Sequence, residues 1–233
     1  MKACVGGKSG AGVWQRIINQ IPPCEVFVSG FLGNCAVMRR LRLPRVAIGI
    51  DADLDVIEQW RRNQKAVRSN AITLLHGCCL DWLKSFFVHM DEPAGVLVYL
   101  DPPYMLGPRG GRLYYRHELS DDQHGQLAEI VATLPCRVLL NHPRCELYDA
   151  ALGGWRRVEY RAMTRGGKLM DDCLWANYPE PDELQDYRFV GRNKRQRERI
   201  RRRCRNWVAS LKRMGTHERG AMLAAVAAEF GGR

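Results

Sequence analysis

The chain has 233 residues, of which 46% are hydrophobic and 26% charged. This composition is typical of a globular domain with an appendage and excludes a disordered chain. No apolar run approaches the roughly 18 residues of a membrane span, and no apolar leader is found, so we expect a protein of the cytosol or nucleoid. The net charge is +11, and eleven basic residues against one acid lie between Arg192 and Arg213. This basic arm (residues 192–213) on a near-neutral body indicates a polyanionic partner.

The nine cysteines are irregularly spaced, and none forms a C-x-x-C pair. The sequence therefore predicts neither a disulfide framework nor a zinc site. We expect reduced, buried thiols and no bound metal.

The first half of the chain alternates helical and strand patterns. Apolar residues at helical spacing predict a helix over residues 13–21, which Pro22 and Pro23 end. A second helix is expected around Val56, Ile57 and Trp60. Short apolar runs predict buried strands over residues 25–28, 45–51, 72–75 and 95–100.

The second half continues this alternation and then changes character. Ser120 is expected to cap a helix that ends near Leu134, and residues 137–140 predict a fifth strand. Two further strands, over 156–163 and 172–177, would form a hairpin around the Arg165-Gly166-Gly167 turn. Residues 179–183 are typical of a linker. Two helices follow, of which Thr216 would cap the second, and the first has an apolar stripe formed by Ile200, Cys204, Trp207, Val208 and Leu211.

These elements predict the fold class and the domains. Apolar strands that alternate with helices favour a mostly parallel α/β sheet covered on both faces, with an antiparallel C-terminal hairpin at one edge. We expect a catalytic domain over residues 1–178 and a linker with a basic helical extension over residues 179–233. Trp207 is expected to pack beneath the arm's helix, because it lies on the apolar stripe.

The most specific signal is a four-residue segment directly after the strand over 95–100. In an open parallel sheet, ligands bind at the carboxyl ends of the strands. The segment's prolines lack N–H donors, so their carbonyls and the carboxylate can accept hydrogen bonds from an amino group, while the tyrosine offers a stacking face. This combination indicates a pocket for an amine on an aromatic ring; the alternative is a tight loop with a capping acid. The four residues are Asp101, Pro102, Pro103 and Tyr104.

This segment resembles the catalytic motif of S-adenosylmethionine-dependent amino methyltransferases, and particularly that of DNA adenine-N6 methyltransferases. The rest of the chain is similar to that family's pattern in the same order. Gly6-Gly7-Lys8 resembles its N-terminal contact with the cofactor's methionine, and Phe31-Leu32-Gly33 its cofactor loop. Asp51 matches the acid that binds the ribose. Residues 76–83 match the segment that lines the adenine, and residues 158–177 and the basic tail resemble small phage-type members.

The resemblance implies a Rossmann-like methyltransferase fold and S-adenosylmethionine as the cofactor. It implies transfer of a methyl group to the N6 amine of an adenine flipped out of duplex DNA. An orphan prophage enzyme and the modification half of a restriction system stay alternatives. The implied catalytic residues are Asp101, Pro102, Pro103 and Tyr104, and the cofactor-binding residues are Gly6, Gly7, Lys8, Phe31, Gly33, Asp51, Cys78 and Asp81.

Several positions depart from the family pattern. Ser29-Gly30 replaces the acid-proline pair before the cofactor loop, Cys35 replaces its second glycine, and Cys78 replaces the acid after His76-Gly77, which leaves Asp81 as the nearest carboxylate. The large recognition insert of longer relatives is absent. A small footprint per chain follows, which favours recognition of DNA by two copies, a homodimer.

Three basic regions are candidates for contact with double-stranded DNA. Arginines suit phosphates and tyrosines suit base stacking. The alternatives are a surface loop, a plain hairpin tip and a solvated helix face. The candidates are Arg109, Arg112, Tyr115 and Arg116 in the loop over 105–117, Arg165 and Lys168 at the hairpin tip, and Arg195, Arg199, Arg202 and Arg203 in the basic arm.

Two other functions compete with this interpretation. An RNA or other amino methyltransferase would use the same core. A nucleic-acid-binding protein whose methyl transfer has decayed would explain Ser29, Cys35 and Cys78, although the intact Asp101–Tyr104 segment argues against it.

Overall fold

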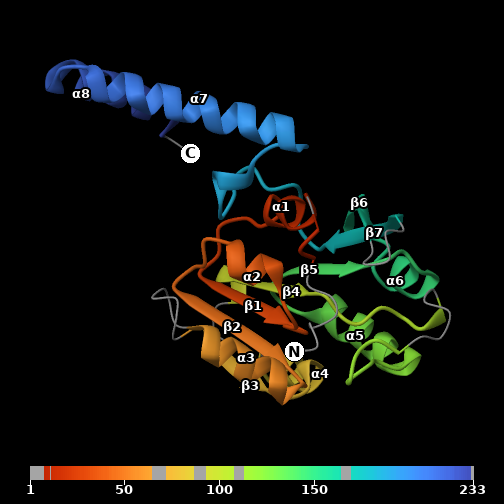
Figure 1. The fold of residues 1–233 in the computed structure, drawn as a ribbon. Helices are drawn as coiled ribbons and strands as arrows, with labels where there is room; N and C mark the ends of the chain where they lie inside the picture. The colour runs from red at the N-terminus through yellow and green to blue at the C-terminus, as the bar shows by residue number, and fades with distance from the viewer. Residues whose placement is uncertain are drawn as a thin grey trace. The chain divides into compact units, whose positions relative to one another are not determined.

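The computed structural model describes residues 8–10, 12–64, 72–86, 93–107, 113–163 and 169–231. The chain divides into two compact units, the first ending at Tyr187 and the second beginning at Arg188. The first unit contains one seven-stranded sheet with the order β3-β2-β1-β4-β5-β7-β6 (Figure 1). Its strands are β1 Val26–Gly30, β2 Val46–Asp51, β3 Thr73–His76, β4 Val96–Leu100, β5 Arg137–His142, β6 Arg156–Met163 and β7 Leu169–Ala176.

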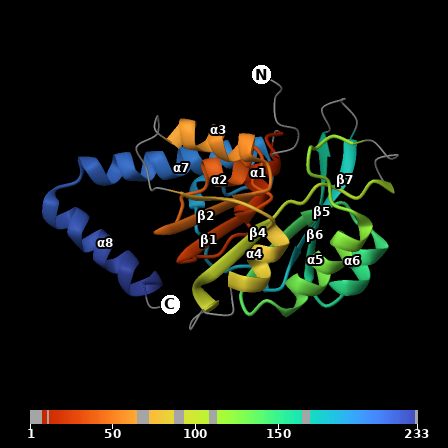
Figure 2. The same ribbon diagram turned by 90° about the horizontal axis from the view of Figure 1, so that it is seen from below.

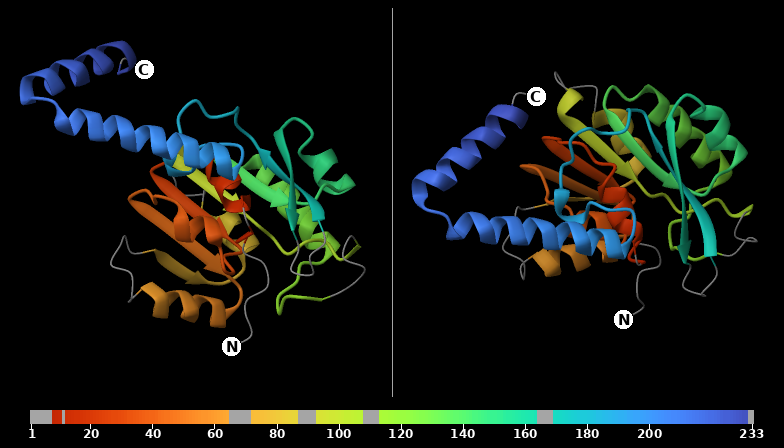
Figure 3. Two further views of the ribbon diagram at one scale, coloured as in Figure 1. Left: turned by 45° about the horizontal axis from the view of Figure 1, so that its top comes forward. Right: turned by 90° about the horizontal axis from the view of Figure 1, so that it is seen from above.

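The pairing of the strands confirms the predicted fold class. Strands β3, β2, β1, β4 and β5 are parallel to one another, and β7 is antiparallel to both β5 and β6. The β6–β7 hairpin therefore forms one edge of a Rossmann-like sheet (Figure 3). The strand order reverses between β1 and β4, and in such sheets this point opens a crevice at the carboxyl ends of the strands.

Helices cover both faces of the sheet (Figure 2). Helices α4, α5 and α6 pack on one face, where Val98, Val138 and Leu140 join Leu127 and Tyr148 in one apolar cluster. Helices α1, α2 and α3 lie on the other face. Burial of alternate strand residues against both layers stabilises the arrangement. The helices are α1 Val13–Ile18, α2 Ala36–Arg40, α3 Leu54–Gln64, α4 Cys79–Phe86, α5 Asp121–Thr133 and α6 Glu146–Ala151.

Helix boundaries follow local capping chemistry. Ser120 caps α5 as predicted, in a capping box in which the Ser120 hydroxyl accepts from Gln123 N and the Gln123 side chain accepts from Ser120 N. Helix α1 ends at Ile18, three residues before the predicted end. The prediction for Thr216 is wrong: Gly215 is the N-cap, and Thr216 is the first helical residue. The short helices α2, α4 and α6 are not among the predicted elements.

The residues that follow the expected linker, Gln185 and Asp186, form hydrogen bonds with the body of the first unit. Gln185 N donates to Ile21 O at 2.9 Å, and Cys24 N donates to Gln185 Oε1 at 3.0 Å. The Asp186 carboxylate accepts from Arg42 N at 2.9 Å. These bonds explain why the first unit continues to Tyr187, beyond the expected boundary at Tyr178.

The short 3-10 helix η4 Tyr187–Phe189 spans the boundary in the chain, and the second unit contains α7 Lys194–Arg213 and α8 Thr216–Phe230. Asn193 caps α7 by accepting from Gln196 N at 2.9 Å. The expectation for Trp207 is wrong: this side chain is 47% exposed, and Val208 is 45% exposed, whereas Leu211 is buried. The apolar stripe of α7 is therefore largely solvent-exposed. No helix within the described ranges has both the length and the apolarity to span a membrane.

All eight cysteines of the described ranges are free thiols. Cys35, Cys79, Cys136 and Cys173 are buried, as expected. Cys78 and Cys204 are exposed, so the expectation of buried thiols is wrong for these residues, and their positions lie at a strand-to-helix loop and on α7.

Candidate active site

The segment Asp101–Tyr104 leaves the sheet at its centre. Strand β4 is buried along its whole length and pairs with β1 as far as Leu100, so the next residue emerges at the carboxyl edge beside the end of β1. Pro102 and Pro103 are themselves buried. Because prolines fix φ, they hold this exit in one conformation. The fold thus places Asp101 at the carboxyl end of a strand, as predicted, and at the point where the strand order reverses.

One oxygen of the Asp101 carboxylate is held by the protein, and the other is left for a ligand. Lys8 Nζ lies 2.8 Å from Asp101 Oδ1, and Asn141 Nδ2 donates to the same oxygen at 3.3 Å. Among the described residues, no hydrogen bond to Asp101 Oδ2 is found. The side chain is 16% exposed. Asp101 is therefore oriented by its neighbours while it keeps a free acceptor.

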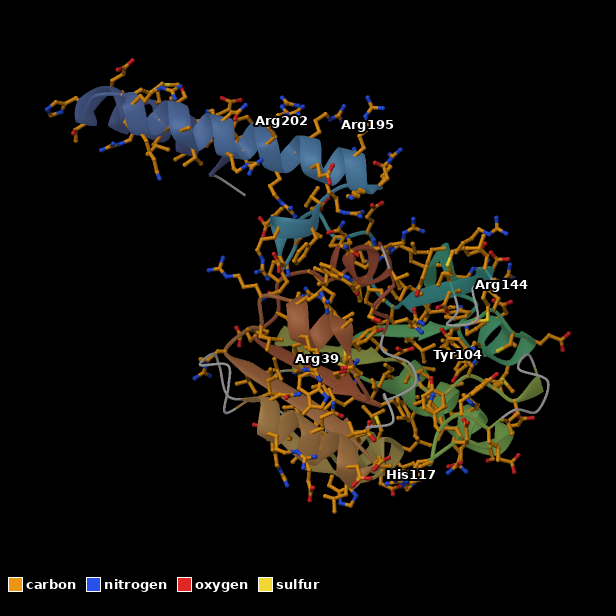
Figure 4. The ribbon with its side chains drawn as sticks, in the orientation of Figure 1. Arg39, Tyr104, His117, Arg144, Arg195 and Arg202 are labelled. Carbon is orange, nitrogen blue, oxygen red and sulfur yellow. The ribbon has the colours of Figure 1, made fainter. Side chains whose placement is uncertain are left out.

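Tyr104 is held at both its hydroxyl and its ring (Figure 4). Its hydroxyl donates to Asp172 Oδ2 at 2.7 Å and also contacts Lys8 Nζ. The Lys8 ammonium lies 4.5 Å from the ring centroid, and the His142 ring meets the tyrosine ring edge-on at 5.1 Å between centroids. These contacts fix the plane of an aromatic ring beside Asp101.

Burial shapes the charges of this cluster. Desolvation raises the pKa of Asp101, although the Lys8 ammonium acts in the opposite direction. Burial alone would lower the pKa of Lys8, but Asp101, Tyr104 and Asp172 outweigh it and raise that pKa well above its usual value. Desolvation likewise raises the pKa of Tyr104, so its hydroxyl stays protonated and able to donate.

His142 supports the loop that follows Tyr104. Its Nδ1 donates to Pro143 O at 2.6 Å, so its Nε2 is free to accept from Met105 N at 3.1 Å. Burial lowers the pKa of His142 to about 3, and the ring is neutral at physiological pH. His142 also contacts the ring of His124, which bonds to Tyr148 Oη through Nδ1 at 2.9 Å. A neutral, packed imidazole thus anchors the backbone beside the Asp101–Tyr104 segment.

The residues expected to bind a cofactor gather partly at the ends of β1 and β2. Phe31 and Gly33 both have left-handed backbones, with φ of 53° and 42°. Gly33 N donates to Asp51 Oδ2 at 2.7 Å, and Asp53 N donates to Asp51 Oδ1 at 2.8 Å. Burial raises the pKa of Asp51. A Cβ at Gly33 would meet only Phe31 O, at 3.9 Å, so the backbone there is open to a ligand.

The other residues predicted to bind the cofactor lie away from the Phe31–Gly33 loop and Asp51, or have other partners in the structure. Lys8 lies in the Asp101 cluster, whereas the prediction gave it the cofactor's methionine. Gly6 and Gly7 lie outside the described residues. Cys78 follows β3 and is exposed, next to Gly77, whose N–H donates to Asp51 O at 3.0 Å. Asp81 is exposed in the first turn of α4, and no described contact brings it to the other candidates.

The departures from the family pattern have local explanations. A Cβ at Gly30 would overlap Cys79 Sγ and lie 2.6 Å from a Leu100 methyl group, so only glycine fits there. The Ser29 hydroxyl donates to Cys35 Sγ at 3.5 Å, and this sulfur accepts from Met38 N at 3.3 Å to cap α2. Cys35 therefore has a structural role at the position where the family has glycine.

The candidates for DNA contact are only partly described. Arg109, Arg112, Arg165 and Lys168 lie outside the described residues. Arg116 Nη1 is bound to Asp53 Oδ1 at 2.9 Å and Asp55 Oδ2 at 2.8 Å, so in this structure its charge is neutralised. Tyr115 N donates to Glu118 Oε1 at 2.9 Å.

The basic arm presents its candidates to solvent. Arg195 and Arg202 project from α7 in Figure 4. All four candidates on this helix are exposed: Arg195, Arg199, Arg202 and Arg203. Their accessibility agrees with, but does not test, a contact with phosphates.

Four buried residues of this site were not predicted from the sequence. They come from β5, which is next to β4 in the sheet, and from the edge hairpin, which follows β5. The sequence signal for these residues was a polar side chain at a strand position that faces the interior of the protein. A polar group buried there needs a hydrogen-bond partner, which indicates a polar cluster. These residues are Asn141, His142, Tyr160 and Asp172.

No protein-family model and no curated protein sequence matches this chain. Solved structures similar to it include a precorrin 8w decarboxylase from Methanobacterium thermoautotrophicum, with 15% identity, a TM-score of 0.45 and coverage of 75% of this chain and 94% of that one. TrmN from Thermus thermophilus has 15% identity, a TM-score of 0.48 and coverage of 70% and 46%. A SAM-dependent methyltransferase from Agrobacterium tumefaciens has 11% identity, a TM-score of 0.46 and coverage of 70% and 58%. Likenesses at this level say nothing about activity.

Proposed function

We propose that the protein is an S-adenosylmethionine-dependent methyltransferase that acts on the N6 amine of adenine in double-stranded DNA. The observation that supports this most strongly is the Asp101 carboxylate at the centre of the sheet, with Oδ1 held by Lys8 and Asn141 and Oδ2 left as an acceptor. Proline carbonyls and the Tyr104 ring lie beside it. An amino group on a planar base has complementary chemistry.

In the proposed reaction, Asp101 and the Pro102 carbonyl accept the two hydrogens of the amine. The nitrogen lone pair is then drawn out of conjugation with the ring and is available to attack. Nitrogen forms a bond to the methyl carbon as the carbon–sulfur bond breaks, and the new ammonium loses its extra proton to Asp101 or water. Catalysis of this kind consists of positioning and electrostatic stabilisation. The Tyr104 ring would stack on the extruded base.

The residues at the ends of β1 and β2 fit the cofactor. The open backbone at Gly33 admits a ligand, and the Asp51 oxygens, each with one hydrogen bond, keep lone pairs for a ribose diol. When bound, S-adenosylmethionine would supply a methyl carbon on a positively charged sulfur. Phe31 and Gly33 would line its approach, and the Asp101 carboxylate would favour the positive charge that passes to the amine.

The basic arm supports DNA as the partner. Ten excess positive charges on residues 192–213 repel one another, and among the described residues of the arm, Lys194 and Glu198 form the single ion pair, 3.9 Å apart. Neutralisation by phosphates removes this repulsion. Contact with DNA phosphates would make affinity strongly salt-dependent.

Transfer of a labelled methyl group tests this proposal. The full chain is incubated with labelled S-adenosylmethionine and either unmethylated genomic DNA or total RNA, and the nucleic acid is digested to nucleosides. We expect label in N6-methyldeoxyadenosine and none in RNA. Label only in RNA would replace DNA with RNA as the substrate. Absence of label from protein that binds DNA would favour the binding-only alternative.

A further inference from the structure

A second carboxylate lies at the heart of the candidate site, although its strand belongs to the edge hairpin. Asp172 is on β7, directly opposite Tyr160 of β6 in the antiparallel register. Only 2% of Asp172 is exposed. Its neighbour in sequence, Asp171, has an 86% exposed side chain and pairs with Arg161 on the surface. The alternation of the strand thus places one acid inside the protein and the other outside.

Side chains from four other segments of the chain contact Asp172. The Tyr104 hydroxyl donates to Asp172 Oδ2 at 2.7 Å, and Tyr160 Oη lies 3.1 Å from the same oxygen. Asn141 Nδ2 lies 3.2 Å from Asp172 Oδ1 and 3.3 Å from Asp101 Oδ1, so one amide bridges the two carboxylates. Lys8 Nζ is 3.5 Å from Asp172 and 2.8 Å from Asp101.

Stability of the fold does not by itself explain a buried carboxylate at position 172. A buried carboxylate loses its hydration, and well-packed apolar residues are often at least as stabilising as a buried ion pair. Asn141 and Lys8, which contact Asp172, also contact Asp101. Tyr104 forms the ring face beside Asp101, and the Tyr160 hydroxyl also donates to Asn141 Oδ1. The arrangement therefore serves geometry at the site more than stability of the sheet.

We propose that Asp172 is a positioning residue for methyl transfer: it fixes the ring plane of Tyr104 through the tyrosine hydroxyl and, through Asn141, keeps Asp101 Oδ1 occupied so that Oδ2 faces the target amine. This inference rests on the proposed function. Asp172 touches neither the amine nor the methyl group; it acts through Tyr104 and Asn141.

The test compares Asp172→Asn with Asp171→Asn as a matched control one residue away. An asparagine at 172 offers a single acceptor oxygen and adds an N–H where the site already supplies donors. We expect the rate constant for methyl transfer in a single turnover to fall about 10²-fold, the loss typical of a small misplacement of reacting groups. The dissociation constants for S-adenosylmethionine and DNA should change less than threefold, by our estimate of an effect confined to positioning. Asp171→Asn should leave all three quantities unchanged.

A double-mutant cycle with Tyr104→Phe separates positioning from general damage. If Asp172 acts through the Tyr104 hydroxyl, the double variant is little slower than Asp172→Asn alone, because that substitution already removes the carboxylate to which the hydroxyl donates. Multiplicative losses would overturn the inference. Tyr160→Phe removes one hydroxyl of the cluster and keeps the test decisive if Asp172→Asn does not fold: a slower transfer with unchanged ligand affinities is expected, and an unchanged rate would overturn the proposal.

The outcomes also separate this inference from the proposed function. A wild-type chain that transfers methyl groups, together with an equally fast Asp172→Asn variant, overturns only the role of Asp172. A wild-type chain that transfers no methyl group to any nucleic acid overturns the proposed function and this inference with it.

Discussion

The candidate active site and the basic arm are held in opposite ways. Around Asp101, side chains from four strands or strand ends share buried hydrogen bonds, and each orients another. On α7, the arginines are exposed and Trp207 is 47% exposed. A buried cluster of hydrogen-bonded side chains fixes one geometry, whereas an exposed row of charges creates an electrostatic field that attracts a polyanion without fixing its position. Substitutions in the first should therefore change the rate of transfer, and substitutions in the second should change affinity and its dependence on salt.

Apart from the loss of Asp101 itself, the largest expected effect comes from removal of the Tyr104 ring. Tyr104→Ala loses both the ring face and the hydroxyl bonded to Asp172, so we expect kcat to fall about 10²-fold to 10³-fold. Tyr104→Phe keeps the ring and should lose about tenfold in kcat, since a hydrogen bond to a charged group such as the Asp172 carboxylate contributes about 1.5 kcal/mol or more. Steady-state transfer to duplex DNA measures both. Equal losses in the two variants would contradict a stacking role.

Acid should destabilise the site through His142. Its pKa is about 3 in the folded protein, below the ordinary value of 6.5, so the unfolded chain binds more protons between these values. The stability that the neutral His142 ring provides is fully present above about pH 6.5 and is lost as the pH drops towards 3, by up to about 5 kcal/mol at roughly 1.4 kcal/mol per pKa unit. Urea unfolding at pH 7 and pH 4 should show a smaller fall for His142→Gln than for wild type. Parallel falls would place the acid sensitivity elsewhere.

The arm should control the salt dependence of binding. Replacement of four exposed α7 arginines with glutamine should reduce the slope of log affinity against log salt by about 3 to 4, at about 0.9 for each phosphate contact. Fluorescence anisotropy with duplex DNA measures this slope. The four residues are Arg195, Arg199, Arg202 and Arg203.

The matched control for the arm is Arg61→Gln with Arg62→Gln, two exposed residues of α3. This variant should leave the slope close to that of wild type. A slope unchanged by the α7 substitutions would remove DNA contact from the arm.

The smallest effect is expected from the exposed tryptophan. Trp207→Ala should change the free energy of unfolding by less than about 1 kcal/mol, as is usual for exposed positions. Trp175→Ala removes a fully buried side chain of β7 and should cost about 3 to 5 kcal/mol. Chemical denaturation of both variants tests the contrast. A large loss for Trp207→Ala would mean that this side chain is covered in solution.

The sheet was predictable because its strands are short apolar runs that end at turns or acids. Helix α5 was predictable from Ser120, whose capping chemistry is local. The N-cap residues of helices α2 and α6 are Cys35 and Cys145, and cysteine is not a usual capping residue. Both helices are also too short to show a clear helical period. The exposure of Trp207 was not predictable, because an apolar stripe indicates burial but does not reveal whether a partner covers it.

The candidate site was predictable where its residues are contiguous and not where the fold assembles them. Asp101–Tyr104 is one segment, so its chemistry can be inferred from the sequence. Asn141 comes from β5, which pairs with β4, whereas Asp172 comes from β7, which the antiparallel hairpin places on the far side of β5. Whether the two side chains meet depends on the register of these strands. The position of Lys8 against Asp101 likewise required the fold, since 93 residues separate them.

The central claim is that Asp101 accepts the hydrogens of an adenine amine while other groups bind the DNA. The most direct measurement is a single-turnover transfer from labelled S-adenosylmethionine to unmethylated duplex DNA, with wild type and Asp101→Ala side by side and DNA affinity measured for both. We predict label in N6-methyldeoxyadenosine with wild type, and a loss of at least about 10³-fold in rate with nearly unchanged DNA affinity for Asp101→Ala. Comparable transfer by Asp101→Ala, or loss of its DNA binding, would contradict the account.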